Sequence, residues 1–458
     1  MNTTETLAKF TVNFRYGDIP QKVVRQAKRC ILDSLGCIIG GYDTRLGKTV
    51  VSSVKEFGGP AQSTIIGDGS KVAPNQAAFA NTALANMLDF DDTSEGIGHP
   101  GNTAIPSALA VGEVGKVSGK DFLLAVVLAY EVSTRIGYGI KPTPARMKAI
   151  FPIACWQTFA AVVAASKLLT LNKKQTVTAL GIAGVSAPLP TSMTKSEERP
   201  LGWNKANIPF ASSNGVLAAY MAKKGVPASQ TILDGDGLWL MAGSDIHDFD
   251  VMTSGLGVEF RIMAISFKPY PSVAWFHSTN DAVATIIEKQ KLKADDIQEI
   301  KVKTLGSAML LDYAPKAMID CQFSLPYGVA MVALRESPGG GWFAEEKMNS
   351  KEVLNILKKI KIEEDPEATS LFGSTKGAIQ RATVDITTME GKTFTERVDY
   401  KRGSVTRPFT DNELKNKFRD LATPVLKTKK TDEVIQMVDK LEEIGDICTL
   451  AEMMQQEV

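Results

Sequence analysis

Cysteine and histidine are both scarce in this chain, which narrows the kinds of site that it can build. Only five cysteines and three histidines occur among 458 residues, and no two cysteines form a CxxC pair. An odd number of irregularly spaced cysteines is typical of buried thiols in a reducing compartment, and unlike a disulfide framework or a zinc site. We therefore expect neither disulfide bonds nor a cysteine-bound metal.

Long apolar runs and an excess of charge of one sign are also missing. The longest apolar run, at 123–129, is far shorter than the roughly 20 residues that a membrane-spanning helix needs. The first residues lack the basic stretch and apolar core of a signal peptide. The 52 basic residues are balanced by 51 acidic ones, which argues against a nucleic-acid-binding surface. These features predict a cytoplasmic protein with neither a membrane nor a nucleic acid as partner.

The motifs that mark common cofactors and hydrolases are absent or out of context. Residues 96–101 spell GxGxxG, but they follow a helical pattern instead of a strand, and a proline interrupts them. HExxH and GxSxG do not occur in the sequence. We interpret the glycine pattern as a chance match and expect no cofactor.

The sequence does contain a long succession of helical patterns, followed by a mixed part. Apolar residues recur every three to four positions in the first 260 residues, whereas later segments alternate apolar and polar residues. The early helices are expected at about 20–39, 75–88, 103–115, 120–136, 155–169, 174–183 and 211–224. The later part predicts strands at 297–304, 381–388 and 393–400, and helices at 281–289, 323–335, 350–358, 410–421 and 432–443.

This change of pattern predicts the fold class and the domains. A chain of 458 residues exceeds what one hydrophobic core usually supports. We expect a mainly α protein with a large all-helical domain at 1–262 and a smaller α+β lid domain at 263–405. The helices at 406–458 are expected to return to the helical domain.

The segment Asp89-Phe-Asp-Asp92-Thr93, followed by His99, has the ingredients of a proton-transfer site. Histidine titrates near neutral pH, and a neighbouring carboxylate can fix its tautomer and hold its charge. The alternative is structural, because aspartate and histidine often cap helix ends or form turns without any chemistry.

Two further segments carry candidate binding residues. Two prolines bracket Tyr270 in Lys268-Pro-Tyr-Pro, and such a stiff loop can aim Lys268 and Tyr270 at a pocket. Lys195 and Lys205 lie in a polar loop between helices, where cations can bind carboxylate or phosphate groups. An interdomain linker and a solvated surface loop are the structural alternatives for these two segments.

A carboxylate metal site is a further possibility. Asp245, His247, Asp248 and Asp250 follow one another closely and could join the acidic residues at 89–92 around a divalent cation. Two of these aspartates alternate with apolar residues in a turn-like segment before Gly255, which is more typical of a solvated turn. We therefore expect no metal.

Five segments, in order along nearly the whole chain, resemble the MmgE/PrpD family. That family includes 2-methylcitrate dehydratase, cis-aconitate decarboxylase and iminodisuccinate epimerase. The segments are ILDSLGC at 31–37, LDFDDT at 88–93 with His99-Pro100, SNGVLAA at 213–219, KPYP at 268–271 with His277, and QFSLPY at 322–327.

The resemblance implies a large helical domain, a smaller α+β lid, a homodimer and catalysis without metal. It places the family's pocket acid and threonine at Asp89 and Thr93, its acid–base histidine at His99 and its KPYP lysine at Lys268. Two departures stand out. Phe151 occupies the position of a second histidine found in decarboxylase-type members, and the family's middle lysine matches Lys205 or Lys195 only with a shift or an insertion.

The residues and the resemblance together predict a metal-free lyase. Removing a proton next to a carboxylate creates negative charge, which requires a base near neutral pH and cations aimed at the growing charge. His99 would be the base or acid, Asp89 would orient it, and Lys268 would pair with a substrate carboxylate. The substrate-binding set is expected to be Thr93, Asp92, Lys205, Lys195 and Tyr270.

The predicted reaction is elimination of water from a small di- or tricarboxylic acid, as in 2-methylcitrate dehydratase. An isomerase or epimerase that uses the same proton abstraction, and a cis-aconitate-type decarboxylase, remain alternatives. A non-catalytic dimer that binds carboxylates is a further alternative of a different class.

Overall fold

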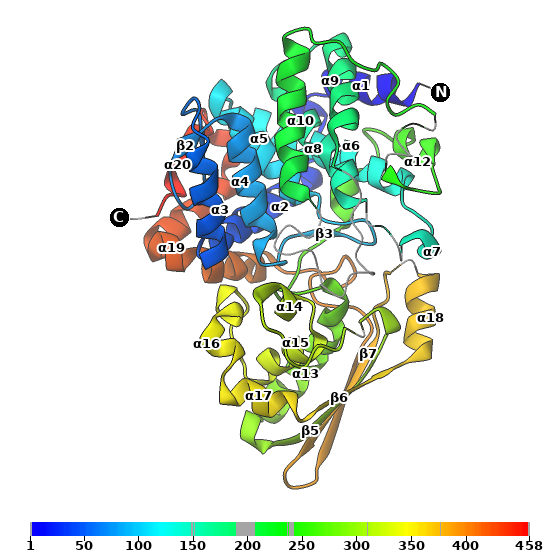
Figure 1. Ribbon diagram of the computed structural model, residues 1–458, viewed down its shortest axis with the longest axis vertical. Coiled ribbons are helices and arrows are strands. Elements are labelled where there is room, and N and C mark those ends of the chain that lie inside the picture. The colour runs from blue at the N-terminus through cyan, green and yellow to red at the C-terminus, as the bar shows by residue number, and fades with distance from the viewer. Residues whose placement is uncertain are drawn as a thin grey trace. The chain divides into compact units, whose positions relative to one another are not determined.

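The computed structural model divides the chain into two compact units, which are described separately (Figure 1). The helical unit comprises Met1–Met87, Asp91–Ile265 and Leu414–Val458, and the mixed unit comprises Leu88–Phe90 and Ser266–Glu413. The mainly α fold class predicted from the sequence is confirmed. The residues that the structure describes are 2–147, 150, 152–188, 207–235, 237, 242–308, 310–375 and 377–456.

The helical unit is built almost entirely from helices. Its strands are short, and β1 (Ser63–Thr64) pairs with β2 (Lys71–Val72) in an antiparallel hairpin, while β3 is Thr93–Ser94. Its helices are α1 (Thr3–Asn13), α2 (Gln21–Tyr42), α3 (Arg45–Glu56), α4 (Pro74–Met87), α5 (Gly101–Gly115), α6 (Gly119–Gly139), α7 (Pro144–Met147), α8 (Ile153–Leu168), α9 (Lys173–Ser186), α10 (Ile208–Lys223), α12 (Phe249–Thr253), α19 (Asp411–Asp439, from Leu414 onward) and α20 (Cys448–Met453).

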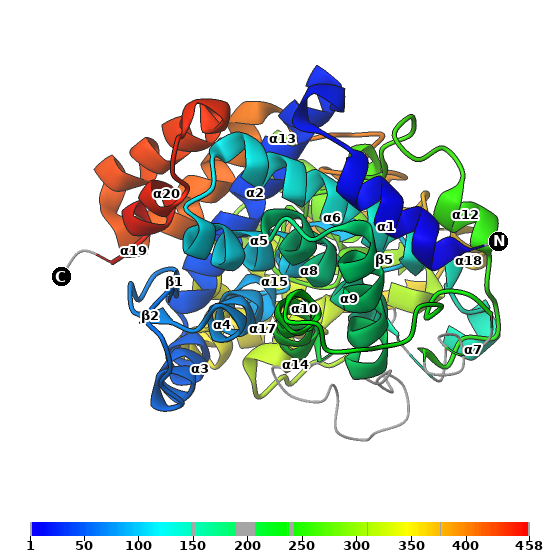
Figure 2. The ribbon, with the colours of Figure 1, turned by 90° about the horizontal axis from the view of Figure 1, so that it is seen from above.

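The core of this unit is centred on α8. The side chains from Ile153 to Ser166 on this helix are all buried, so the helix has no solvent face, as expected of a helix packed on every side. Helices α5, α6, α9 and α10 pack against α8, and Figure 2 shows α8 among them. Small residues allow this close approach: a Cβ added at Gly215 of α10 would lie 2.7 Å from the carbonyl oxygen of Thr158 on α8.

Local signals in the sequence set where these helices begin. The Ser118 side chain accepts a hydrogen bond from the backbone N–H of Asp121 at the start of α6. Asn172 and Gln175 form a reciprocal capping box at the start of α9. Helix α6 is long and apolar enough to cross a membrane by length and composition, but 94% of its most apolar window is buried inside the structure. A core helix passes the same test, so this finding is weak evidence for a membrane span.

The mixed unit combines helices with a four-stranded sheet of order β6-β5-β7-β8. Strand β5 pairs parallel with β6 and antiparallel with β7, and β8 pairs antiparallel with β7. The strands are β5 (Ile297–Thr304), β6 (Ile360–Glu364), β7 (Ala382–Thr388) and β8 (Thr393–Val398), and β4 (Ile265–Ser266) marks the division between the units. The helices are α13 (His277–Gln290), α14 (Met318–Gln322), α15 (Leu325–Ala333), α16 (Glu345–Met348), α17 (Lys351–Leu357) and α18 (Pro366–Ser374).

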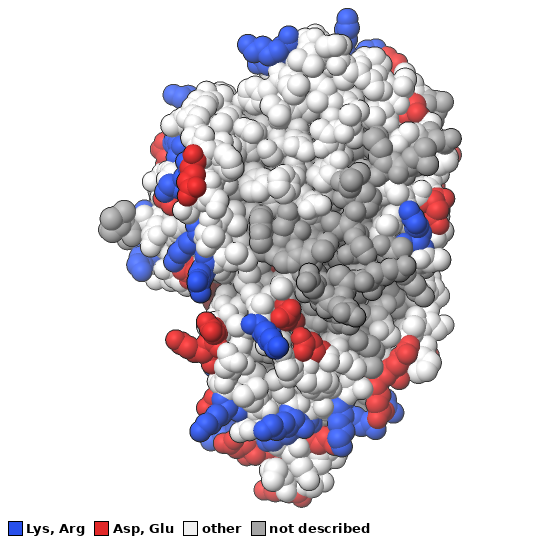
Figure 3. All heavy atoms as spheres, in the orientation of Figure 1, with Lys and Arg blue, Asp and Glu red and all other residues white. Residues whose placement is uncertain are grey.

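The two faces of this sheet differ in polarity as the alternating sequence predicts. Every second residue of β7 is buried, and the intervening ones are half-buried. Ion pairs join the neighbouring strands β5 and β6: Lys301 lies 3.2 Å from Glu363, and Lys361 pairs with Glu299. Figure 3 shows positive and negative side chains interspersed on this end of the mixed unit.

Two later helical predictions are confirmed with shifted ends. The helix predicted at 323–335 is α15, which begins two residues later and ends two residues earlier. Its start is set by the Ser324 hydroxyl, which accepts a hydrogen bond from the backbone N–H of Tyr327, and by Pro326 in the first turn. The helices predicted at 410–421 and 432–443 are the two parts of α19, which are separated by a kink at Lys427, where φ is 64°.

Candidate active site

His99 lies in the connection between α4 and α5, and one hydrogen bond and one ion-pair contact hold its ring. Its Nδ1 atom is 3.0 Å from the carbonyl oxygen of Asp92, with which it makes a hydrogen bond, and 2.9 Å from Oδ2 of Asp91, a charge contact without hydrogen-bond geometry. A carbonyl oxygen can only accept a hydrogen bond, so the ring proton belongs on Nδ1. This tautomer leaves the lone pair of Nε2 available as a base. The His99 side chain as a whole is 14% exposed.

The Asp92 carboxyl group binds the start of α5 and Tyr130, and only its backbone carbonyl group contacts the His99 ring. Its Oδ1 accepts a hydrogen bond from the backbone N–H of Gly101 at 3.1 Å, and its Oδ2 accepts one from the Tyr130 hydroxyl at 2.5 Å. Position 101 must be glycine for this contact, because an added Cβ would lie 2.6 Å from both the Asp92 carboxylate and the Tyr130 hydroxyl. Burial raises the pKa of Asp92 to about 8, an effect that the nearby Asp33 and Asp91 increase.

Several polar groups around His99 are buried without a visible partner. The Thr93 hydroxyl, the Asn102 amide and the Gln157 Oε1 atom find no hydrogen-bond partner within the described part of the chain. Gln157 donates its amide hydrogen to the carbonyl oxygen of His99, and the backbone N–H of Asn102 donates to the same oxygen at 3.3 Å. Leaving a buried polar group unpaired costs about 1 to 3 kcal/mol, so these groups are suited to bind a polar ligand or water.

The mixed unit carries the other two predicted catalytic residues as a pair. The Lys268 ammonium group lies 3.0 Å from Oδ1 of Asp89 and donates to the Asp89 carbonyl oxygen at 2.8 Å. Both side chains are at most 3% exposed. Asp89 adopts a left-handed backbone conformation with φ of 49°, which is uncommon for a residue other than glycine. The structure thus brings Lys268 and Asp89 together, whereas Asp91 provides the carboxylate next to His99.

Tyr270 and His277 lie close to one another in the same unit. Their rings are 5.6 Å apart in an edge-on arrangement, and the Tyr270 hydroxyl donates to Oδ1 of Asp281 at 3.1 Å. The Nε2 atom of His277 is 3.2 Å from the carbonyl oxygen of Ser272. Complete burial, helped by the positive charges of Lys401 and Lys268, lowers the pKa of His277 well below its usual value. This histidine therefore remains neutral at physiological pH.

Three residues singled out from the sequence lie outside the described residues. These are Lys195, Lys205 and Phe151. The substrate-binding role predicted for the two lysines stays a prediction, as does the effect of phenylalanine at position 151.

The aspartates considered for a metal site have local structural partners. Oδ1 of Asp248 accepts a hydrogen bond from the backbone N–H of Val251 at the start of α12, and Asp245 accepts from the N–H and hydroxyl of Thr143. These bonds lower the pKa of Asp245. Among the residues that the structure describes, no group of three or more His, Cys, Asp or Glu side chains is arranged to hold a metal ion.

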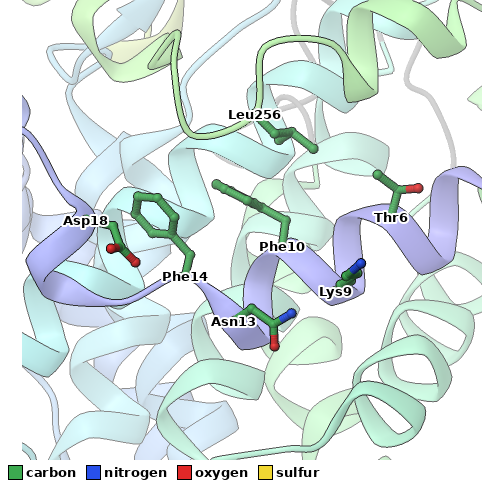
Figure 4. A pocket seen from close by; sticks show the side chains of 7 residues that line it. All are labelled: Thr6, Lys9, Phe10, Asn13, Phe14, Asp18 and Leu256. Atoms are coloured by element: carbon green, nitrogen blue, oxygen red, sulfur yellow. The ribbon is translucent and has the colours of Figure 1, made fainter.

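A shallow pocket of about 340 Å³ lies elsewhere on the helical unit, where Phe10 of α1 and Phe14, the residue after this helix, lie near Leu256 (Figure 4). The two phenylalanine rings are 5.0 Å apart. Thr6, Lys9, Asn13 and Asp18 complete its lining, and none of the predicted site residues contributes to it. The candidate chemistry is therefore not associated with this pocket.

Two family models together match almost the entire chain. The model of the MmgE/PrpD N-terminal domain matches residues 5–252, and that of the MmgE/PrpD C-terminal domain matches residues 270–443. The chain belongs to the MmgE/PrpD family. The family resemblance noted in the sequence is thereby confirmed.

Curated relatives of this MmgE/PrpD chain are similar over their full length. It is 28% identical over 466 residues to the cis-aconitate decarboxylase of Mus musculus, covering 99% of this chain and 93% of that protein. The Homo sapiens cis-aconitate decarboxylase is 26% identical, with 98% and 94% covered. The cis-aconitate decarboxylase of Aspergillus terreus (strain NIH 2624 / FGSC A1156) is 24% identical, with 98% and 95% covered.

Sequence reasoning missed three residues that contact His99 or its neighbour Asp92 in this MmgE/PrpD chain. Asp91 was noted only as part of an acidic run, although it supplies the carboxylate next to the imidazole. Tyr130 on α6 reads as an ordinary apolar-face residue, and Gln157 on α8 is a single polar residue in a buried helix. A polar residue inside an otherwise apolar helix was the one signal that could have indicated Gln157.

Proposed function

We propose that this chain is a lyase that acts on a small di- or tricarboxylic acid by general acid–base catalysis at His99. The proposal rests on one observation above all, the orientation of the His99 ring. With Nδ1–H donated to the Asp92 carbonyl and the Asp91 carboxylate close to the same nitrogen, Nε2 can take a proton from a substrate carbon next to a carboxylate or return one to it. The Asp91 carboxylate stabilises the imidazolium that forms when Nε2 takes the proton.

The first candidate reaction is the elimination of water. His99 would remove the proton from the carbon next to a carboxylate, the electron pair would form the carbon–carbon double bond, and the hydroxyl group would leave as water with the proton returned by the imidazolium of His99. The Thr93 hydroxyl and the Asn102 amide, which have no partner among the described residues, are suited to bind substrate oxygens in such a reaction.

The second candidate is decarboxylation, which the names of the full-length relatives favour. Here a carbon–carbon bond breaks, carbon dioxide leaves without the electron pair, and the imidazolium of His99 protonates the remaining carbanion. This reaction needs one proton donor at the reacting carbon, so a single oriented histidine is sufficient for it. Both reactions share the carbanion next to a carboxylate, and both use the same atom of His99.

The test is a substrate panel combined with a matched pair of histidine variants. Wild-type protein is assayed for water loss from 2-methylcitrate and citrate, and for carbon dioxide release from cis-aconitate. His99→Gln should lower kcat about 100- to 10,000-fold while the fold is retained, because general acid–base catalysis contributes about that much. His247→Gln is the control, since His247 is an exposed histidine of the same unit.

The outcomes separate the candidates. Water loss supports the hydro-lyase, and carbon dioxide release supports the carboxy-lyase. Near-wild-type turnover in a folded His99→Gln variant would overturn the assignment of the base. Exchange of substrate hydrogen for solvent deuterium without any product would indicate an isomerase, and thermal stabilisation by these acids without exchange or turnover would indicate a binding protein.

A further inference from the structure

Two residues with carboxamide side chains meet at the backbone carbonyl group of His99. Gln157 on α8 donates its amide hydrogen to this carbonyl oxygen, and the backbone N–H of Asn102, in the first turn of α5, donates to the same atom at 3.3 Å. Because a carbonyl oxygen can only accept hydrogen bonds, the NH2 end of Gln157 must face it. This arrangement holds the Gln157 amide against the start of α5 and leaves its Oε1 atom unused.

Both carboxamide side chains are buried and have unused hydrogen-bonding capacity. Asn102 and Gln157 are each 0% exposed. Oε1 of Gln157, and both Nδ2 and Oδ1 of Asn102, make no hydrogen bond to any residue that the structure describes. The backbone carbonyl of Asn102, in contrast, accepts a hydrogen bond from the Thr82 hydroxyl at 2.8 Å. Buried amide groups are normally hydrogen-bonded, so these three atoms are expected to meet a ligand or a water molecule.

The unused atoms indicate which kind of ligand group fits. They are two carbonyl oxygens, which accept hydrogen bonds, and one NH2 group, which donates them. A carboxylate cannot donate, so both amide oxygens would oppose it. The charged groups that raise the pKa of Asp92, at the same end of α5, are the acidic residues Asp33 and Asp91. A hydroxyl group donates one hydrogen bond and accepts others, so it matches the unused atoms better than a carboxylate does.

We propose that Asn102 and Gln157 are specificity-determining residues that bind a hydroxyl group of the substrate. The site would then select hydroxy acids over acids of the same skeleton that lack the hydroxyl. This inference rests on the proposed function, because it names the substrate class of the His99 site. Two amides that only held a water molecule would bind both kinds of acid equally.

The test compares acids that differ in one hydroxyl group. Isothermal titration calorimetry measures the binding of citrate against propane-1,2,3-tricarboxylate, and of malate against succinate, to the full chain. His99→Gln, which keeps the backbone carbonyl that Asn102 and Gln157 contact, is titrated in parallel so that turnover does not obscure binding. In at least one pair the hydroxy acid should bind about 10- to 100-fold more tightly, because the acid without the hydroxyl leaves buried amide groups unpaired.

Variants of similar size locate this preference. Asn102→Leu and Gln157→Met remove the amide groups, so the hydroxy acid should lose affinity while its partner acid keeps it. Asn102→Leu retains the hydrogen bond from Gln157 to His99, which separates loss of the hydroxyl site from a shift of the histidine. Asn102→Ala, which adds no bulk, replaces the leucine variant if that variant does not fold.

Thr158→Val is the matched control. Thr158 follows Gln157 on the same buried helix, but its hydroxyl donates to the carbonyl oxygen of Ala154 at 2.9 Å within that helix. Its loss should leave the preference for the hydroxy acid unchanged.

The outcomes distinguish this inference from the proposed function. Equal affinities within both pairs, or no binding of any of the four acids, would overturn the specificity role. A preference that persists in the folded Asn102 and Gln157 variants would overturn it as well. A preference that these variants abolish, in a protein that converts none of the acids, would support the specificity role while contradicting the lyase. Turnover that depends on His99 but shows no preference for the hydroxyl would leave the lyase standing and remove this inference.

Discussion

Asp91 and Asp92 are neighbours in the chain, yet the fold gives their carboxyl groups different partners. Asp91 lies against the His99 imidazole, whereas both oxygens of Asp92 are engaged by Tyr130 and the start of α5. The two carboxyl groups therefore have separate tasks at neutral pH. Asp91 can carry charge for the imidazole, and Asp92 is held as a mostly neutral group within the core. The substrate contact predicted for Asp92 stays a prediction. Both of its carboxyl oxygens already make hydrogen bonds within the protein, which argues against that contact.

The raised pKa of Asp92 predicts how stability depends on pH. Folding raises this pKa from 3.8 to about 8, so between these values the folded protein keeps a proton that the unfolded chain releases. The free energy of unfolding should therefore fall as pH rises through this window, by about 1.4 kcal/mol per pH unit from this group. Urea unfolding of wild type and Asp92→Asn at pH 5, 6, 7 and 8 measures the difference between the two proteins.

The free energy of unfolding of Asp92→Asn should rise relative to that of the wild type with each increase in pH. The difference between the two free energies should level off above about pH 8. The comparison cancels other groups with raised pKa values, such as Glu113 and Glu131, because both proteins contain them. A difference that stayed constant from pH 5 to 8 would contradict a buried, protonated Asp92.

At the scale of single residues, the sequence predicts the histidine better than its carboxylate partner. The scarcity of histidine and the nearby acidic run are visible without a structure, and they indicate His99. Which carboxylate meets the ring depends on the backbone. The chain leaves α4 through a left-handed conformation at Asp89, which redirects the side chains that follow. Aspartate is one of the few residues besides glycine that adopt this conformation, but three aspartates occur in the segment and the sequence does not show which of them does so.

At the scale of elements, a buried arginine on α6 holds the segment that follows α12. Arg135 is fully buried, pairs with Glu131 one turn earlier, and donates hydrogen bonds to the carbonyl oxygens of Val251, Ser254 and Glu259. The other oxygen of Glu131 accepts from the backbone N–H of Arg261 at 2.6 Å. The Arg135–Glu131 ion pair thus supplies hydrogen-bond partners to backbone carbonyl and N–H groups of a segment that has little regular structure of its own.

Replacing this arginine should be costly. Arg135→Met leaves Glu131 without its charged partner and three carbonyl groups without donors, and breaking a buried pair in this way costs about 3 to 5 kcal/mol. Thermal and urea unfolding measure the loss. Arg146→Met is the control, because the exposed Arg146 donates to a single carbonyl group, that of Gly243, and its loss should cost less than about 1 kcal/mol. Equal stability of the two variants would contradict the role given to Arg135.

The elements themselves were predictable where one local signal dominates. The predicted helices near α2, α4, α6 and α8 and the hairpin of β7 and β8 are confirmed within a few residues. Strand β6 was missed because most of its residues are exposed or half-buried and its parallel pairing with β5 joins segments far apart in sequence. The kink of α19 at Lys427 lies in the gap predicted between the helices at 410–421 and 432–443, and Pro424 lies close before it.

At the scale of the whole molecule, the chain enters the mixed unit and returns from it. Apart from Leu88–Phe90, the helical unit takes the residues before Ser266 and those from Leu414 onward, so most of the mixed unit is one continuous insertion. The change of sequence pattern near residue 260 indicates where this insertion begins. The predicted boundaries at 262 and 405 stay a prediction of domains, since compact units and independently folding domains are different properties.

We expect the protein to form a homodimer through the outer face of α10. Phe210 and Leu217 on this helix are 47% and 46% exposed, and Figure 3 shows almost no charged side chains over α10 and α4. A two-fold interface sets one face against its own copy, which an uncharged apolar face allows without repulsion between like charges. Light scattering after size-exclusion chromatography should give twice the mass of one chain.

Leu217→Glu should shift this mass toward that of a single chain, because each interface would then contain two opposed carboxylates. Val258→Glu is the control: Val258 is 81% exposed and lies on the loop after α12, away from α10 in sequence. A wild-type protein with the mass of one chain would contradict the dimer, and a Leu217→Glu dimer would place the interface on another face.

An ion pair joins the Lys417 ammonium group of α19 to the Asp33 carboxylate of α2 at 2.7 Å, and it has a consequence for the order in which the protein folds during synthesis. Ribosomes deliver α2 early, and some 380 further residues emerge before the lysine that neutralises it. Until then Asp33 lacks this partner, so the native packing of α2 against α19 must await the synthesis of α19. A chain truncated before α19 would lack the ion pair permanently, and we expect it to be less stable than the full chain.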